Sequence, residues 1–165
     1  MHASQILSSG RIGKIRFFNM HMYTNVDPGN KYYETTWRKD PHYQGGFLLD
    51  AGVHFAAMLR MILGVPIASV AAYSRLNKEI LVPIDTLHAA VRLADGTTGT
   101  FCAAFSSTQA CKNFSIVGEK GYVTIEMVPG SWKVTVTEND KLEEKQFSFE
   151  GDNFNRDTDS CYCYY

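Results

Sequence analysis

The longest apolar run in the chain covers residues 47–63, and its only ionisable residues are Asp50, His54 and Arg60. A glycine pair precedes the run and Gly64 follows it, as is typical of helix boundaries. When residues are placed about 100° apart, the apolar side chains occupy almost the whole circumference, which is typical of a helix that protein covers on most sides. The pattern therefore predicts one long, buried helix.

The rest of the chain has the pattern of β-strands. A helix end is expected at residues 3–9 and a long strand at residues 14–25, followed by a polar, aromatic-containing loop at residues 26–44. After Gly64 we expect strands at residues 67–75, 84–93, 97–106, 112–117, 122–127, 132–137 and 145–149. Short turns that contain Gly or Asx separate several of these runs, which favours antiparallel neighbours.

This order of elements predicts an α+β domain with a large, mostly antiparallel open sheet and one buried helix layer on one face. A single helix layer leaves the second face of the sheet to be explained. Strand 14–25 carries apolar groups on both faces, with Phe17 on one and Phe18 on the other. Either the alternation in a single sequence is too noisy to interpret, or the second face forms a sheet-on-sheet homodimer.

Length and composition are those of a globular protein. The chain has 165 residues, of which 45% are hydrophobic and 20% charged, so we expect one domain over residues 1–150 and an irregular tail over residues 151–165. A net charge of -1 and scattered Lys and Arg argue against nucleic-acid or membrane partners. No signal-peptide pattern is present, and the four cysteines form no C-x-x-C motif, which favours a cytoplasmic protein with reduced thiols.

The best functional lead is Asp50 with His54, because four residues apart on a helix they share one face of an otherwise apolar segment. Two structural explanations compete with an active-site role. A carboxylate in the first turn interacts favourably with the helix dipole, and an ionisable pair at this spacing adds only a few tenths of a kcal/mol. A metal site is not expected, because a third ligand at a recognisable spacing is missing.

Several motifs in order resemble the second domain of the glucose-fructose oxidoreductase / inositol dehydrogenase (Gfo/Idh/MocA) family. The matching residues are Ser9-Gly10-Arg11-Ile12-Gly13-Lys14-Ile15, Trp37-Arg38, Gly45-Gly46, Asp50-x-Gly52-x-His54, residues 59–64 and Ile116-Val117-Gly118-x-Lys120-Gly121. The resemblance covers roughly residues 3–150. It implies the fold of a glyceraldehyde-3-phosphate-dehydrogenase-like C-terminal domain.

The resemblance also implies a function. In this family an N-terminal Rossmann domain holds NAD or NADP, while the second domain supplies the substrate pocket and a sheet used for oligomer contacts. Substrates are commonly sugars or polyols. His54 then matches the general acid/base, since imidazole titrates near neutral pH, and Asp50 matches a residue that orients the imidazole ring or binds substrate hydroxyls. Trp37, Arg38 and Tyr43 match pocket-wall positions, although core packing is an equal alternative for Trp37.

The chain also departs from the family pattern. No strand-Gly-x-Gly-x-x-Gly-helix unit is present, because Gly10 and Gly13 precede a predicted strand, which is the wrong context for a dinucleotide fingerprint. We therefore expect the Rossmann domain to be absent and this chain alone to be inactive and to bind no dinucleotide. Lys120 lies in a hairpin turn and does not match the family's catalytic lysine. Two functions remain open: the substrate and dimerisation half of an NAD(P)-dependent oxidoreductase, or a non-catalytic interaction or regulatory domain derived from one.

Overall fold

The computed structural model describes residues 2–30, 32–41 and 45–148. The elements in chain order are α1 (His2–Ser8), β1 (Ile15–Asn25), α2 (Thr36–Lys39), α3 (Gly46–Leu63), β2 (Ile67–Arg75), the short 3-10 helix η1 (Glu79–Leu81), β3 (Thr86–Leu93), β4 (Thr98–Ala104), β5 (Ser106–Gly118), β6 (Gly121–Val128), β7 (Ser131–Glu138) and β8 (Lys141–Ser148). The tail predicted at residues 151–165 lies outside the described residues.

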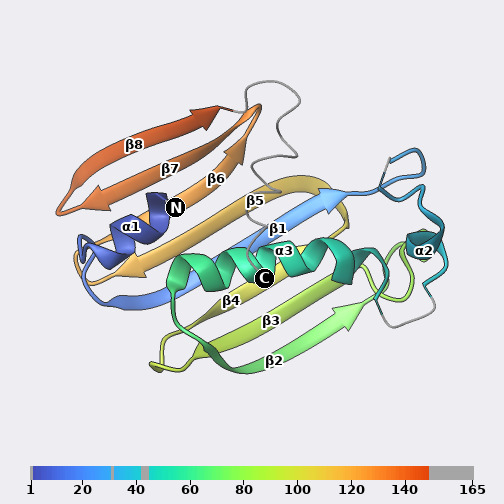
Figure 1. Cartoon of the computed structure of the whole chain (residues 1–165), viewed down its shortest axis with the longest axis horizontal. Coiled ribbons are helices and arrows are strands. Elements are labelled where there is room, and N and C mark those ends of the chain that lie inside the picture. The colour runs from blue at the N-terminus through green and yellow to red at the C-terminus, as the bar shows by residue number, and fades with distance from the viewer. Residues whose placement is uncertain (1, 31, 42–44, 149–165) are drawn as a thin grey trace.

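All the described strands form one sheet with α3 and α1 on the same face (Figure 1). The eight strands follow the order β2-β3-β4-β1-β5-β6-β7-β8. Only the β1–β4 pair is parallel, and the other neighbouring pairs are antiparallel. The predicted α+β class with a large, mostly antiparallel open sheet is confirmed.

The core lies between this sheet face and the helices. β1 alternates strictly, with Phe18, Met20 and Met22 buried beneath α3, because successive side chains of a strand point to opposite faces. Phe105 follows β4, and its ring packs against the rings of Phe47 and Phe55 on α3, at centroid distances of 5.2 and 6.4 Å. These aromatic contacts fix the N-terminal half of α3 over the ends of β1 and β4.

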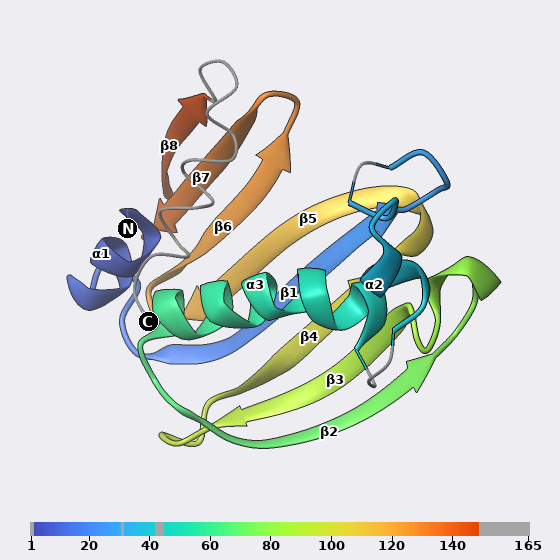
Figure 2. The same cartoon turned by 45° about the vertical axis from the view of Figure 1, so that its right-hand side comes forward.

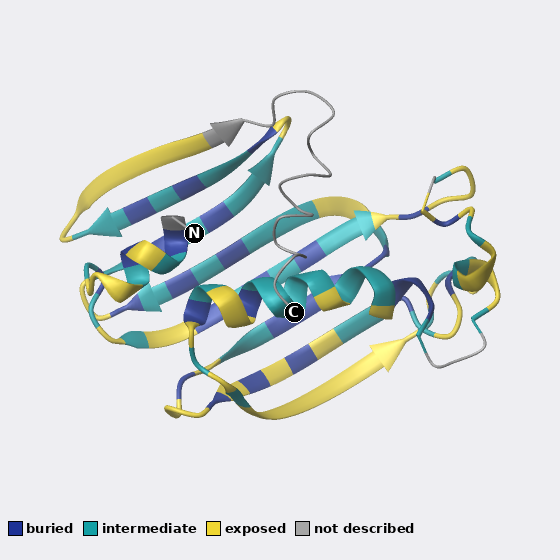
Figure 3. Cartoon of the chain, in the orientation of Figure 1, coloured by how far each residue is buried: buried dark blue, intermediate teal, exposed yellow. Residues whose placement is uncertain are grey.

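The outer side of α3 remains open in the described chain, as the exposed segments on this helix in Figure 3 show. The side chains of Leu49, Val53 and Met61 are between 52% and 62% exposed. The prediction that protein covers most sides of this helix is therefore wrong for the described chain. The sheet covers only one apolar side of α3. By length and composition alone, this helix is also long and apolar enough to cross a membrane.

The predicted strands are confirmed, with differences at their ends. β5 begins at Ser106 rather than at residue 112. Residues 106–111 were not predicted as a strand because none of them is buried and they show no alternating pattern. β8 likewise begins at Lys141. Two short helices, α2 and η1, were not predicted, because segments of four and three residues are too short to show a helical period.

The sheet face away from α3 carries mostly small polar side chains along its centre. The registers of β4, β1, β5 and β6 align Thr100, Asn19, Ser115 and Thr124 across it. The next row is more apolar and aligns Phe17, Val117 and Tyr122, with Phe17 44% and Tyr122 40% exposed. No described helix covers this face (Figure 2).

Candidate functional site

α3 places Asp50 and His54 on one side of its first turns, as their spacing predicts. The helix begins at Gly46, whose φ is +54°. A Cβ atom at this glycine would lie 2.2 Å from the carbonyl oxygen of Val82, so only glycine fits here. This close contact fixes the start of the helix, and with it Asp50 and His54, against the loop between η1 and β3.

Arg38 on α2 binds Asp50 directly. Its Nε donates a hydrogen bond of 2.7 Å to Asp50 Oδ2, and the two side chains are only 14% and 26% exposed. Shielding from water strengthens such an ion pair compared with a surface pair. The sequence predicted that Asp50 would orient His54 or bind substrate, and the structure shows that Asp50 is itself held by Arg38.

The guanidinium of Arg38 is held by several further groups. Its Nη1 donates to the carbonyl oxygen of Tyr32 and to Thr35 Oγ1, at 3.0 and 2.9 Å. Its Cζ lies 4.2 Å from the centroid of the Trp37 ring, within the range of a cation–π contact. Arginine can make all these contacts at once because its donors lie in a planar fork, so α2 and the preceding loop present one prearranged cation to α3.

The remaining predicted residues have separate outcomes. Trp37 is 53% exposed, so the alternative of core packing is wrong and its ring instead flanks Arg38. Tyr43 lies outside the described residues. Tyr32 and Thr35 were missed, because loop residues that act through a carbonyl or a hydroxyl carry no sequence pattern.

Partial burial lowers the pKa of His54 below its ordinary value of 6.5, while the negative charge of Asp50 opposes this shift. This shift favours the neutral form of the imidazole, which is the form that accepts a proton. The imidazole of His54 and the carboxylate of Asp50, which Arg38 holds in place, are the kinds of group found in a proton-transfer site.

Replacing Asp50 with asparagine should lower the pKa of His54 further. The change removes the negative charge of Asp50, which favours the imidazolium, and leaves burial, which disfavours it. An NMR titration of the imidazole resonances in both proteins measures the effect, with Asp40→Asn as a matched change next to α2. An unchanged or raised His54 pKa in Asp50→Asn would show that the carboxylate does not act on the imidazole.

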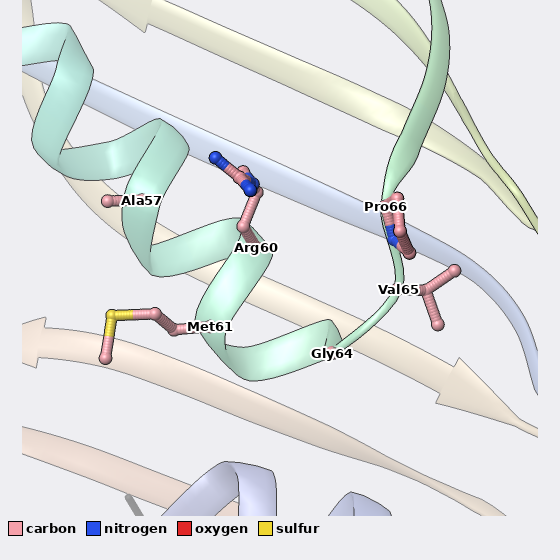
Figure 4. Close-up of a pocket in the computed structure, with 6 residues that line it drawn as sticks. All are labelled: Ala57, Arg60, Met61, Gly64, Val65 and Pro66. Atoms are coloured by element: carbon pink, nitrogen blue, oxygen red, sulfur yellow. The ribbon is translucent and has the colours of Figure 1, made fainter. Parts of the chain in front are cut away.

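A separate open pocket of about 270 Å³ lies where α3 ends, lined by Ala57, Arg60, Met61, Gly64, Val65 and Pro66 (Figure 4). It contains none of the predicted site residues and a single charged group, Arg60. Among the described residues no group of three metal-binding side chains occurs. The Asp50 and His54 side of α3 therefore stays the candidate site.

The segment from Gly10 to Gly13 does not have the context of a dinucleotide fingerprint. Gly10 and Gly13 have the positive φ of turn glycines, but the chain then enters β1 rather than a helix. A pyrophosphate site needs the N-terminus of a helix after such a turn. Gly10 and Gly13 are therefore turn glycines that lead into a strand.

Comparison with known proteins identifies the family. The family model described as "Oxidoreductase family, C-terminal alpha/beta domain" matches residues 4–158, and the chain belongs to this Gfo/Idh/MocA family. It is 36% identical over 138 residues to the dehydrogenase FPY6 of Fusarium mangiferae, and this alignment covers 81% of this chain and 40% of the relative. It is also 36% identical over 120 residues to an uncharacterized protein of Saccharomyces cerevisiae, which covers 71% of this chain and 34% of the relative. The chain thus spans less than half the length of these relatives.

Solved structures confirm the fold. An oxidoreductase from Thermotoga maritima is 30% identical with a TM-score of 0.75, over 98% of this chain and 46% of that one. An oxidoreductase from Agrobacterium radiobacter, in complex with NAD+, L-tartaric acid and magnesium, is 16% identical with a TM-score of 0.76, over 97% of this chain and 47% of that one. The predicted resemblance is therefore confirmed.

Proposed function

We propose that this chain is the substrate-binding and oligomerisation half of an NAD(P)-dependent oxidoreductase that acts on a sugar, a polyol or a related hydroxy compound. The observation that carries the proposal is the partly buried imidazole of His54, whose pKa is lowered by burial, on the same side of α3 as Asp50, which Arg38 holds at 2.7 Å. Membership of the oxidoreductase family supports the reaction class. A small-molecule substrate is supported by a relative of this fold, the WlbA dehydrogenase of Bordetella pertussis, which was solved with NADH and UDP-GlcNAcA.

In this proposal His54 is the general base for oxidation. A nicotinamide bound by another domain would supply the acceptor for the hydride that leaves the carbon of the substrate. The ring of His54 accepts the proton of the hydroxyl on that carbon, and the reverse reaction returns it. Asp50 stabilises the imidazolium that forms, and Arg38 keeps the carboxylate in place through its fixed fork of donors.

The exposed outer side of α3 supports a partner domain at this site. Leu49, Val53, Ala57 and Met61 follow one another at helical spacing, and three of them are more than half exposed. An apolar stripe of this kind on a soluble chain marks an interaction surface. We propose that the nucleotide-binding domain docks on this stripe, which brings the nicotinamide beside His54 and excludes water.

A chimeric enzyme tests this function. Residues 4–148 replace the matching part of the Fusarium dehydrogenase, and turnover of sugars and polyols with NAD or NADP is measured. We expect turnover by the chimera, and no dinucleotide binding in calorimetry by this chain alone. A folded chimera without turnover would favour the alternative, a non-catalytic interaction or regulatory domain.

We further propose that the open sheet face forms a homodimer. The row of Phe17, Val117 and Tyr122 offers an apolar strip beside a polar centre, and a stable two-fold interface buries on the order of 1,600 Å² in total. Ser115→Arg places a charge in the centre and should yield a monomer in analytical ultracentrifugation at tens of micromolar. Gln109→Arg, on an exposed part of β5, is the control. A wild-type monomer at that concentration would contradict the dimer.

A further inference from the structure

Lys112 is a cation on the face of the sheet that otherwise holds the core. It lies on β5 in register with Met22 of β1, which is in register with Ala103 of β4. Met22 and Ala103 are each 1% exposed. Residues in register across neighbouring strands point to the same face, so the side chain of Lys112 rises on the side of the sheet that α3 covers.

The side chain of Lys112 has no anionic partner among the described residues. The next residue on the same face of β5 is Phe114, which is fully buried. Within the described part of the chain, no hydrogen bond or ion pair of the Lys112 side chain is found. Partial burial lowers the pKa of its ammonium group. A half-buried ammonium without an anionic partner is unfavourable, so this lysine is a candidate to bind an anion.

The flank of α3 that carries His54 faces β5. Figures 1 and 2 both show α3 in front of β1 and β4 and running opposite to β1. The contact with Phe105 places Phe55 on the side of α3 that faces the sheet. In a right-handed helix that runs in this direction, residue 54 then lies on the flank toward β5, and residue 59 lies on the flank toward β3.

The position along the strands agrees with this orientation. Phe105 contacts both Phe47 and Phe55, so it lies beneath the first turns of α3. Ala103, in the row of Met22 and Lys112, comes two residues before Phe105 on the same strand line. A step back of two strand residues, about 6.6 Å, corresponds to about four helix residues at 1.5 Å each. The turn of His54 therefore lies over the row of Lys112.

From this arrangement we propose that Lys112 binds an anionic group of the substrate, a carboxylate or a phosphate, while His54 acts on a hydroxyl of the same molecule. The inference rests on the function proposed above and narrows the substrate class to acidic or phosphorylated sugars and polyols. Lysine serves here as a point charge with three donors, which suits either kind of anion. Lys112 is thus a specificity-determining residue rather than a catalytic one.

NMR with lysine labelled with carbon-13 at Cε tests the proposal on the full chain. The probes are gluconate, sorbitol 6-phosphate and neutral sorbitol, and the reporters are Lys112 Cε and the imidazole of His54. We expect gluconate or sorbitol 6-phosphate to shift both reporters. Sorbitol should bind more weakly by roughly 10- to 100-fold, the worth of a hydrogen bond to a charged group. The two anionic probes distinguish a carboxylate from a phosphate ligand.

Variants complete the test. Lys112→Met should remove the preference for the anionic probe without changing the affinity for sorbitol. Lys112→Arg should keep most of this preference. Lys141→Met, on exposed β8, is the control and should behave as wild type. Equal binding of the anionic and neutral probes, or no shift of the Lys112 resonance, overturns the proposal. The measurement on the wild-type chain decides this even if Lys112→Met does not fold. When sorbitol still shifts His54, only the role of Lys112 fails. When no probe shifts His54, the proposed function fails as well.

Discussion

Replacing His54 with alanine in the chimeric enzyme should lower kcat by roughly 10²- to 10⁴-fold, the usual contribution of a positioned general acid or base. Removal of the imidazole leaves water as the proton acceptor. Folding should survive, because His54 lies on the flank of α3 rather than in the core that Phe47, Phe55 and Phe105 form.

His88→Ala is the matched control for this change. His88 is exposed on β3, in register with Cys102 on the open face of the sheet and therefore away from α3. This variant should keep the kcat of the parent enzyme, measured under saturating substrate and cofactor. A similar loss in both variants would mean that the effect of His54→Ala comes from stability rather than chemistry.

The largest effect on stability is expected for Asp85→Ala. Asp85 is fully buried between η1 and β3, and its carboxylate accepts hydrogen bonds from the backbone N–H groups of Asn77 and Lys78, at 3.0 and 2.7 Å, and from Thr86 Oγ1 at 2.7 Å. Alanine would leave two backbone donors without an acceptor, so the free energy of unfolding should fall by about 2–5 kcal/mol.

The effect of Asp85→Ala should extend to the candidate site. The backbone carbonyl of Asp85 accepts a hydrogen bond from the N–H of Phe105, and Phe105 supports the first half of α3. Urea unfolding measures the change, with Asp95→Ala as control. Asp95 is exposed in the turn before β4 and accepts one hydrogen bond, from the N–H of Thr97, so its loss should cost about 1 kcal/mol or less. Equal midpoints of urea unfolding for the two variants would show that the hydrogen bonds of Asp85 do not stabilise the fold more than that of Asp95.

The sequence predicts well what depends on local periodicity. Strand alternation such as that of Phe18, Met20 and Met22, and the turn residues between strands, carry enough signal to predict the sheet. The spacing of Asp50 and His54 places both on one side of a helix for the same reason.

What the sequence does not predict depends on contacts between distant segments. No sequence feature near Arg38 predicts its bond to Asp50, twelve residues further along the chain. No sequence feature around Asp85 distinguishes this buried charge from a surface one. The exposed side of α3 was also not predictable. An apolar pattern around the whole helix is the same whether this side packs within the domain or against another domain.

The most direct test of the central claim, that His54 is the group that moves the proton, is the pH dependence of kcat for substrate oxidation by the chimera. The parent enzyme should lose activity on the acid side as His54 becomes protonated, at a pH below 6.5 because burial lowers this pKa. Asp50→Asn should keep this limb and move it to lower pH, since the charge that favours the imidazolium is gone. His54→Ala should lose the limb. A His54→Ala enzyme with the kcat and pH profile of the parent would contradict the account and leave the imidazole a structural group.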